Sequence, residues 1–145
     1  MASVLVTSII RAPIDRVWSA IRDFNALPDW HPFVSASRIE ESLPSATIGC
    51  VRNFQLQETG ETIRERLLAL SDADHSCTYS ILDAPMPVSN YVATFQLLPI
   101  TTTNETLGQW QASFEVPDDE HPETIKLITK VFEEGFANVS KLLNP

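Results

Sequence analysis

The sequence predicts an α+β fold: a curved seven-stranded antiparallel sheet wrapped around a long C-terminal helix, with two short helices after the first strand. Short segments of alternating apolar and polar residues recur between about residues 35 and 116, which is typical of antiparallel strands. One long amphipathic segment, from about Pro122 to Leu143, ends the chain. A sheet with one apolar face needs a cover, and a single long helix supplies it.

The N-terminal part predicts one strand and two short helices. Residues 3–11 have mixed apolar and hydroxyl character and form the first strand. Ala12-Pro13 then opens a helix, because proline suits the first helical turn. We expect a second helical piece from Asp23 to Pro28, followed by an irregular segment from Trp30 to Phe33.

Six further strands are expected at about 35–41, 48–57, 61–71, 75–83, 90–98 and 104–116. Gly, Pro, Asp and Asn residues occupy the turns between them. The final helix has a broad apolar face made of Ile125, Ile128, Val131, Phe132, Phe136, Val139 and Leu143.

The composition is that of one ordinary globular domain covering residues 1–145. Ten basic and nineteen acidic side chains give a formal charge of −9, which argues against a nucleic-acid partner. We see no signal peptide, and no apolar run approaches the about 18 residues of a membrane span. We therefore expect a cytoplasmic protein.

Two charged residues stand among apolar ones on neighbouring strands. Arg52 shares a strand face with Cys50, Phe54 and Leu56, because strand side chains alternate. On the next strand, Glu65 shares a face with Ile63, Leu67 and Ala69, whereas Arg64 and Arg66 point to the other face and to water. A lone charge facing an apolar interior is costly, so Arg52 and Glu65 should pair, reach trapped water or hold a ligand.

Such a pair could be catalytic. Arg52 could hold a ligand oxygen or carboxylate through its fork of donors, and Glu65 could accept or return a proton. These roles suit enolisation, dehydration or ring closure. An internal ion pair that only satisfies itself is the alternative. Tyr79 and Tyr91 could offer hydroxyls to the site, or to backbone carbonyls.

The candidate ligand-binding residues surround this pair. His31 lies near the expected pocket mouth, where a surface imidazole is favoured over a ligand contact. The full candidate set is His31, Phe54, Leu56, Ile63, Tyr79, Tyr91, Phe95, Trp110, Phe132 and Phe136.

We expect no metal site and no cofactor. The three histidines lack metal-ligand spacing, and the four glycines form no phosphate-binding loop. Cys50 and Cys77 should lie on strands separated by a third strand, so we expect two reduced thiols.

Several motifs carry a family resemblance. Ala12-Pro13-Ile-Asp-Arg-Val-Trp18 and Leu27-Pro-Asp-Trp30 resemble the START-like (SRPBCC, helix-grip) superfamily of polyketide cyclases and dehydrases, allergen-type carriers and hormone receptors. Gly49-Cys-Val-Arg52 and Asn90-Tyr-Val-Ala-Thr94 resemble two of its plant branches, the lachrymatory-factor synthases and the abscisic acid receptors. The first branch implies a catalytic role for Arg52 and Glu65, and the second implies the polar end of a ligand pocket.

The chain also departs from the receptor pattern. Gln57-Glu-Thr-Gly-Glu61 replaces the receptors' Ser-Gly-Leu-Pro gate, and Ala84-Pro-Met-Pro-Val-Ser89 replaces their His-Arg-Leu latch. His31 stands about where they carry a ligand-binding lysine. We therefore rank binding of a small hydrophobic or amphiphilic molecule, lipids included, above a cyclase, dehydratase or isomerase activity. A non-catalytic interaction module, with a possible homodimer, ranks third.

Overall fold

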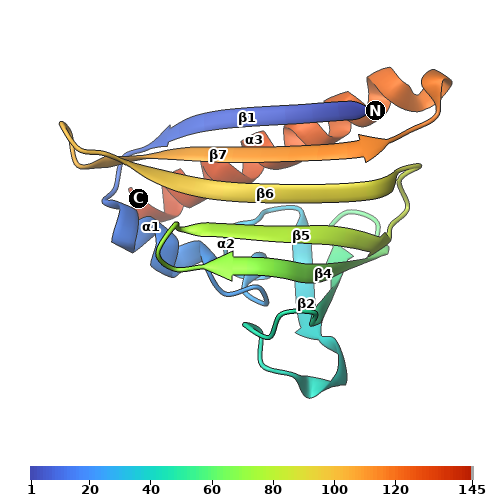
Figure 1. The fold of residues 1–145 in the computed structure, drawn as a ribbon, viewed down its shortest axis with the longest axis horizontal. Helices are drawn as coiled ribbons and strands as arrows, with labels where there is room; N and C mark the ends of the chain where they lie inside the picture. The colour runs from blue at the N-terminus through green and yellow to red at the C-terminus, as the bar shows by residue number, and fades with distance from the viewer. Residues whose placement is uncertain (145) are drawn as a thin grey trace.

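The computed structural model describes residues 1–144 of the chain (Figure 1). Strands and helices alternate early in the chain, and strands dominate its middle. Their order is β1 (Ala2–Ile10), α1 (Ile14–Ile21), α2 (Leu27–Trp30), β2 (Val34–Ile39), the 3-10 turn η1 (Glu40–Ser42), β3 (Val51–Leu56), β4 (Thr62–Ser71), β5 (Ser76–Asp83), β6 (Ser89–Ile100), β7 (Glu105–Glu115), the 3-10 turn η2 (Asp118–Glu120) and α3 (His121–Leu143).

Within residues 1–144 the strands form one seven-stranded antiparallel sheet in the order β1-β7-β6-β5-β4-β3-β2. Every strand from β2 to β7 pairs with the strand that precedes or follows it in sequence. The exception in chain order is β1, which pairs with β7 from Ala2 opposite Phe114 to Ile10 opposite Thr106. The helix α3 runs behind β1, β7 and β6 in Figure 1. This arrangement confirms the predicted α+β fold.

Helix α3 covers the sheet with the face that its sequence pattern indicates. Pro122 lies in its first turn, where a missing N–H group is harmless. Its buried residues are Thr124, Ile128, Phe132, Gly135, Phe136 and Val139. The buried strand residues include two alternating sets, Tyr91, Ala93, Phe95 and Leu97 on β6 and Trp110, Ala112 and Phe114 on β7.

The second short helix lies later in the chain than predicted. It begins at Leu27 and has Pro28 in its first turn, whereas we expected Pro28 to end it. Proline starts helices as readily as it stops them, and here the starting role applies. The helix therefore includes Trp30, which we placed in an irregular segment and which is 3% exposed.

Two details of the strands also differ from the prediction. β3 begins at Val51 rather than near Ile48, because Gly49 adopts a positive φ of 92° that no extended strand uses. Ala69 is exposed although Leu67 on the same strand is fully buried. The register between β4 and β5 shifts between these two residues, so the inward alternation is broken there.

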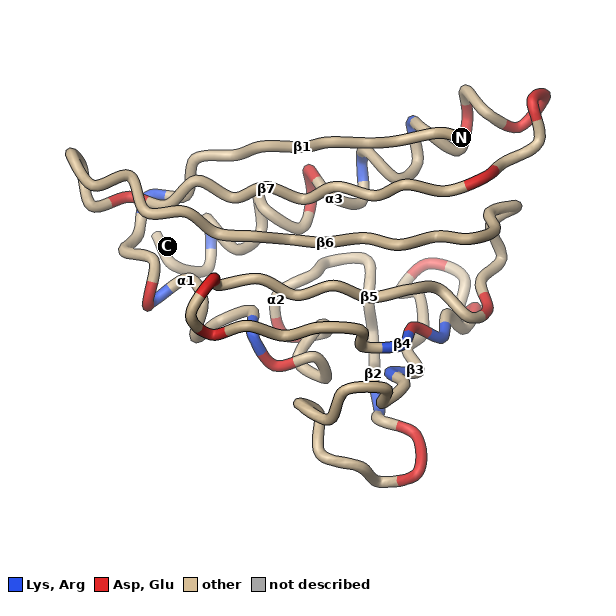
Figure 2. Tube along the Cα trace, viewed as in Figure 1, with Lys and Arg blue, Asp and Glu red and all other residues tan. Residues whose placement is uncertain are grey.

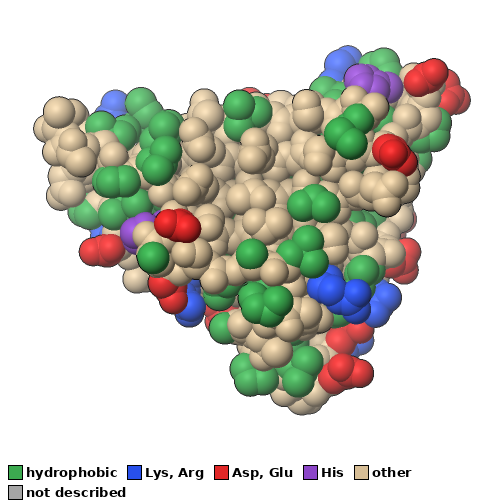
Figure 3. All heavy atoms as spheres, viewed as in Figure 1, with side chains coloured by type: hydrophobic (Ala, Val, Ile, Leu, Met, Phe, Trp, Pro, Cys, Tyr) green, Lys and Arg blue, Asp and Glu red, His purple; other side chains and the backbone are tan. Residues whose placement is uncertain are grey.

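Charged residues lie mostly at strand ends, in loops and on α3 (Figure 2). One exception is the region where β2, β3 and β4 lie side by side, which carries several arginines. Arg64 there reaches Glu40, with Nε 2.7 Å from Oε2, so it makes an ion pair rather than meeting only water. The sheet face seen in Figure 3 is mainly uncharged, with separate apolar side chains.

Two features are absent from residues 1–144. No helix within residues 1–144 is both long and apolar enough to cross a membrane. The same residues bring together no group of three or more His, Cys, Asp or Glu side chains that could hold a metal ion. Cys50 and Cys77 are free, buried thiols on opposite sides of β4.

Candidate functional site

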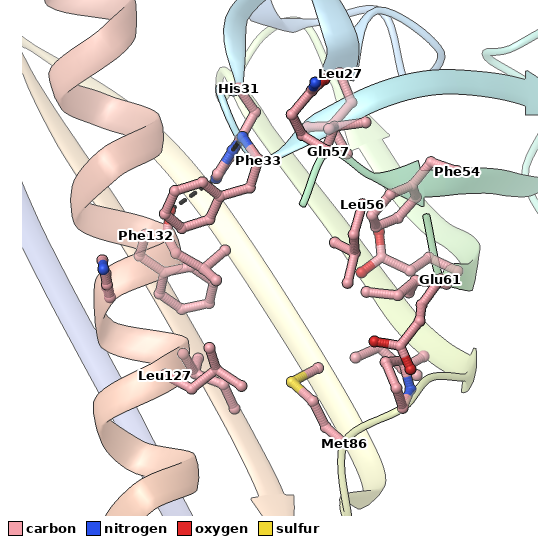
Figure 4. A pocket seen from close by; sticks show the side chains of 18 of the residues that line it. Leu27, His31, Phe33, Phe54, Leu56, Gln57, Glu61, Met86, Leu127 and Phe132 are labelled. Carbon is pink, nitrogen blue, oxygen red and sulfur yellow. Dashed lines mark hydrogen bonds between the residues drawn. The ribbon is translucent and has the colours of Figure 1, made fainter. Parts of the chain in front are cut away.

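A pocket of about 540 Å³ lies between α3 and the strands β3 and β4. Most of the side chains around it are aliphatic or aromatic. They come from α2 and the segment after it, from all the strands from β2 to β7, from the β3–β4 and β5–β6 loops, and from the first half of α3. Figure 4 shows Phe132 and Leu127 of the helix facing Leu56 and Phe54 of the sheet.

Arg52 and Glu65 form an ion pair in the wall of this pocket. They are direct partners in the register of β3 and β4. Nη2 of Arg52 is 2.6 Å from Oε1 of Glu65, and Nε donates to the same oxygen at 2.8 Å. The residues are 4% and 6% exposed. The structure therefore contains the inward pair that strand alternation predicted.

Further contacts hold the guanidinium of Arg52 in place. Nη1 donates to the backbone carbonyl of Phe24 at 3.1 Å. The ring of Phe24 lies 4.0 Å from the guanidinium carbon and that of Tyr79 lies 4.9 Å from it. Aromatic faces attract cations, most strongly where water is excluded. The ring of Phe54 lies farther away, at 5.7 Å. Arg52 is thus held by one carboxylate and one carbonyl, with three rings around it.

Burial and pairing set the charges of the two groups. Burial raises the pKa of the Glu65 carboxyl, while Arg52 acts in the opposite direction. Burial alone would lower the pKa of Arg52. The charge of Glu65, the nearby Tyr79 and Cys77 and the hydrogen bond to Glu65 together outweigh burial and raise that pKa, so the guanidinium stays charged. The short contacts are those of a carboxylate with a guanidinium. Glu65 is therefore a carboxylate that binds a proton more readily than an exposed one.

Two tyrosines lie in the wall beside the ion pair. Trp110 Nε1 donates to the hydroxyl of Tyr79 at 3.0 Å. An indole nitrogen can only donate, so the Tyr79 oxygen accepts and its own proton remains available for another acceptor. Burial raises the pKa of Tyr79 and of Tyr91 well above the ordinary value. Both side chains therefore remain neutral phenols.

His31 is buried, and its predicted surface position is wrong. It is 3% exposed and lines the pocket. Nε2 lies 2.8 Å from the carbonyl oxygen of Val131 on α3, and Nδ1 accepts from the backbone N–H of Phe33 at 3.1 Å. Burial lowers its pKa to about 4, so the ring is neutral at physiological pH.

A glycine explains how His31 fits under the helix. A Cβ atom on Gly135 would lie 2.9 Å from His31 Cδ2 and 2.9 Å from Trp110 Cζ3. Only a residue without Cβ lets α3 approach this closely. A glycine inside the apolar face of a predicted helix is the sequence signal that could have indicated the contact.

Eight of the ten predicted ligand-binding residues line the pocket, namely His31, Phe54, Leu56, Ile63, Tyr79, Tyr91, Trp110 and Phe132. Phe95 and Phe136 lie outside the lining. Phe95 packs in the core against Trp18, with ring centroids 6.1 Å apart. Phe136 packs against Trp110 and fills the space above Gly108.

Sequence reasoning missed the residues around the pocket mouth. Glu58 and Glu61 come from the β3–β4 loop and Leu127 and Lys130 from α3, and all four are exposed. Figure 4 shows Met86 of the β5–β6 loop between Leu127 and Glu61. Their exposure depends on how the loops and helix meet, which no local pattern encodes.

A curved antiparallel sheet that grips one long helix, with an apolar pocket between them, defines a protein of the helix-grip class. The chain belongs to the family described as polyketide cyclase / dehydrase and lipid transport, which matches residues 1–144. This match confirms the START-like resemblance.

Individual relatives are found in plants and bacteria. The chain is 30% identical over 99 residues to the abscisic acid receptor PYL7 of Arabidopsis thaliana. That match covers 67% of this chain but 45% of the receptor, so the chain spans less than half of the receptor's length.

Solved structures match over almost the whole chain. The protein XoxI of Bacillus cereus has a TM-score of 0.88 and 32% identity, covering 98% of this chain and 95% of its own. An uncharacterised protein of Bacillus thuringiensis has a TM-score of 0.83 and 33% identity, covering 97% and 98%.

Proposed function

We propose that residues 1–145 act as one cytoplasmic domain that binds a small hydrophobic or amphiphilic molecule between α3 and the sheet. The observation that carries this proposal is the pocket of about 540 Å³, which is lined by apolar side chains and contains one buried ion pair. Small-molecule sites commonly combine an apolar wall with a few polar groups that orient the guest. The family's description, which includes lipid transport, supports the same function.

The two ends of the pocket suggest how a guest is oriented. Its apolar body would contact Phe54, Leu56 and Phe132, which come from both sides of the pocket. Its polar end would meet Arg52 and Glu65. An apolar guest covers surface that is otherwise in contact with water, so the hydrophobic effect drives its entry.

Native mass spectrometry of the purified protein tests this proposal, because a bound guest adds a defined mass. The same spectra test the possible homodimer. Isothermal titration with the recovered guest should then give one site per chain. Leu127→Glu should weaken binding, because it places a charge at the mouth. Leu142→Glu is the matched control, since Leu142 is also exposed on α3 but lies outside the pocket lining. A protein that takes up no guest would contradict the proposal.

A second candidate function is catalysis by Arg52 and Glu65. The raised pKa of Glu65 favours it, because a carboxylate with a higher pKa is a stronger base. In an enolisation, Glu65 would take the proton from the carbon next to a carbonyl group. The electron pair of that C–H bond would form the C=C bond of the enolate, the π electrons of the carbonyl would move to its oxygen, and Arg52 would bind the resulting oxyanion.

Glu65→Gln separates the two candidates. It keeps the shape of the side chain but removes the base. If the site is catalytic, this variant should lose turnover and still bind guests, measured by product formation and by titration. If folding and binding are lost equally, the pair has a structural role only.

A further inference from the structure

We propose that the pocket selects uncharged ligands whose polar end is a hydroxyl, ketone or ester, and that it rejects carboxylates and amines. This inference rests on the proposed ligand-binding function. Its basis is the balance of charge inside the pocket. Within residues 1–144, the charged side chains that are buried are Arg52 and Glu65, and they are paired with each other.

The cation of Arg52 is already neutralised. Two of its nitrogens contact Glu65 Oε1, and a third donates to the Phe24 carbonyl. A ligand carboxylate placed beside Arg52 would therefore also lie beside the carboxylate of Glu65. Two like charges in a poorly hydrated pocket repel each other strongly. Arg52 therefore does not offer a free positive charge to an acid.

His31 does not offer one either. Its Nδ1 accepts an N–H from Phe33, so that nitrogen carries no proton, and its Nε2 faces the carbonyl of Val131. This geometry requires the neutral tautomer with hydrogen on Nε2. Protonation would break the bond to Phe33. His31 stands about where the abscisic acid receptors carry a ligand-binding lysine. Its hydrogen bonds keep it neutral.

The mouth does not favour anions. Glu58, Glu61 and Lys130 line it and are all exposed. Together they carry two negative charges and one positive charge. Exposed charges are hydrated and screened by salt, so their effect on a guest inside the pocket is small. The selection proposed here therefore arises at the buried end.

The buried end still offers hydrogen bonds. Nη1 and Nη2 of Arg52 each carry two hydrogens, and one hydrogen of each is used by Phe24 or Glu65. The second hydrogens can bind a carbonyl or hydroxyl oxygen. Both contacts of Arg52 fall on Oε1 of Glu65, so Oε2 can accept from a hydroxyl. An uncharged oxygen group uses these partners without adding a charge.

A series of three probes with the same aromatic body tests the inference. Isothermal titration near neutral pH would compare 2-naphthylmethanol, naphthalene-2-carboxylate and 2-naphthylmethylamine. We expect the alcohol to bind at least about tenfold more tightly than either charged probe. Equal or tighter binding of the acid or the amine would overturn the inference and leave the proposed function intact. If none of the three binds and no guest co-purifies, the proposed function itself is wrong.

Glu65→Gln tests the source of the selectivity. It removes one negative charge and leaves Arg52 with an uncompensated positive charge, so the carboxylate probe should become the preferred ligand. Glu133→Gln is the matched control, because Glu133 is exposed on α3 outside the pocket lining. It should keep the wild-type order of affinities. An unchanged order in a folded Glu65→Gln protein would contradict the inference. If circular dichroism shows that this variant does not fold, the three-probe comparison on the wild-type protein decides alone.

Discussion

Arg52 and Glu65 lie opposite each other in the register of β3 and β4, and the guanidinium contacts the carboxylate at 2.6 Å. Both side chains point into the same apolar interior, where neither could remain charged without the other. The stability of the fold and the polar end of the pocket therefore both depend on the Arg52–Glu65 ion pair. This dependence can be measured.

Replacing one member of the pair should be far more damaging than replacing both. Glu65→Leu leaves the buried charge of Arg52 unpaired and should lower the free energy of unfolding by about 3–5 kcal/mol. The double variant Arg52→Met, Glu65→Leu removes both charges and should be within about 2 kcal/mol of wild type. Urea unfolding of the three proteins provides the comparison. A double variant as unstable as the single one would show that the loss comes from packing.

Gly135→Ala should destabilise the protein although alanine favours helices. The new Cβ would lie 2.9 Å from both His31 and Trp110, so α3 would have to move away from the sheet. Overpacking should lower the free energy of unfolding by about 1–3 kcal/mol, and the better helix propensity of alanine should offset about 1 kcal/mol of this. We expect the overpacking to prevail. Denaturant unfolding measures the difference. Glu134→Ala, at the exposed neighbouring position, should be close to neutral.

His31 should make stability depend on pH in a defined window. Its pKa is about 4 in the folded protein, against 6.5 for an ordinary exposed histidine such as that of the unfolded chain. Between these values the unfolded chain binds a proton that the folded protein does not, so stability falls as the pH falls. From about pH 7 to pH 5 the loss should be about 2 kcal/mol.

His31→Gln should lack this part of the pH dependence. Other groups titrate in both proteins, and subtracting the two urea-unfolding curves at each pH removes their contribution. The difference between wild type and variant should therefore shrink as the pH falls from about 7 to 5. A difference that stays constant would show that His31 is protonated as easily in the folded protein as in the unfolded one.

Tyr79→Phe should reveal the value of the hydroxyl that Trp110 uses. Without it, Trp110 Nε1 is buried with its acceptor removed, and we expect a loss of about 1–3 kcal/mol. Thr78→Val on the same strand is the control, because the half-buried Thr78 hydroxyl bonds Thr94 where water can replace it. Thermal unfolding compares the two. Equal losses would argue against a special role for the indole bond.

The main features of the site could be predicted because they follow from strand periodicity. Arg52, Phe54 and Leu56 alternate along one strand, and Glu65 falls on the inward face of the next. Two inward charges of opposite sign on adjacent strands have few alternatives to pairing. The long C-terminal helix was equally clear from its apolar face.

The remaining features depend on contacts between distant segments. His31 follows α2, and only the approach of Gly135 on α3 makes its position buried. Ala69 is exposed because one register shift reverses the alternation that Leu67 follows. Phe95 belongs to an inward set, yet Trp18 and Trp110 stand around it and separate it from the pocket. Local patterns contain no information about these neighbours.

The close packing of α3 at Gly135 also determines which end of the pocket can change shape to fit a ligand. There the helix meets His31 and Trp110 without room to slide or rotate, so the surroundings of the polar end are rigid. Leu127 and Met86 border the opening, where side chains have solvent beside them and can change rotamer. The pocket would therefore suit ligands that share one polar head group and differ in the length of their apolar tail. It would suit ligands of one length with different head groups less well.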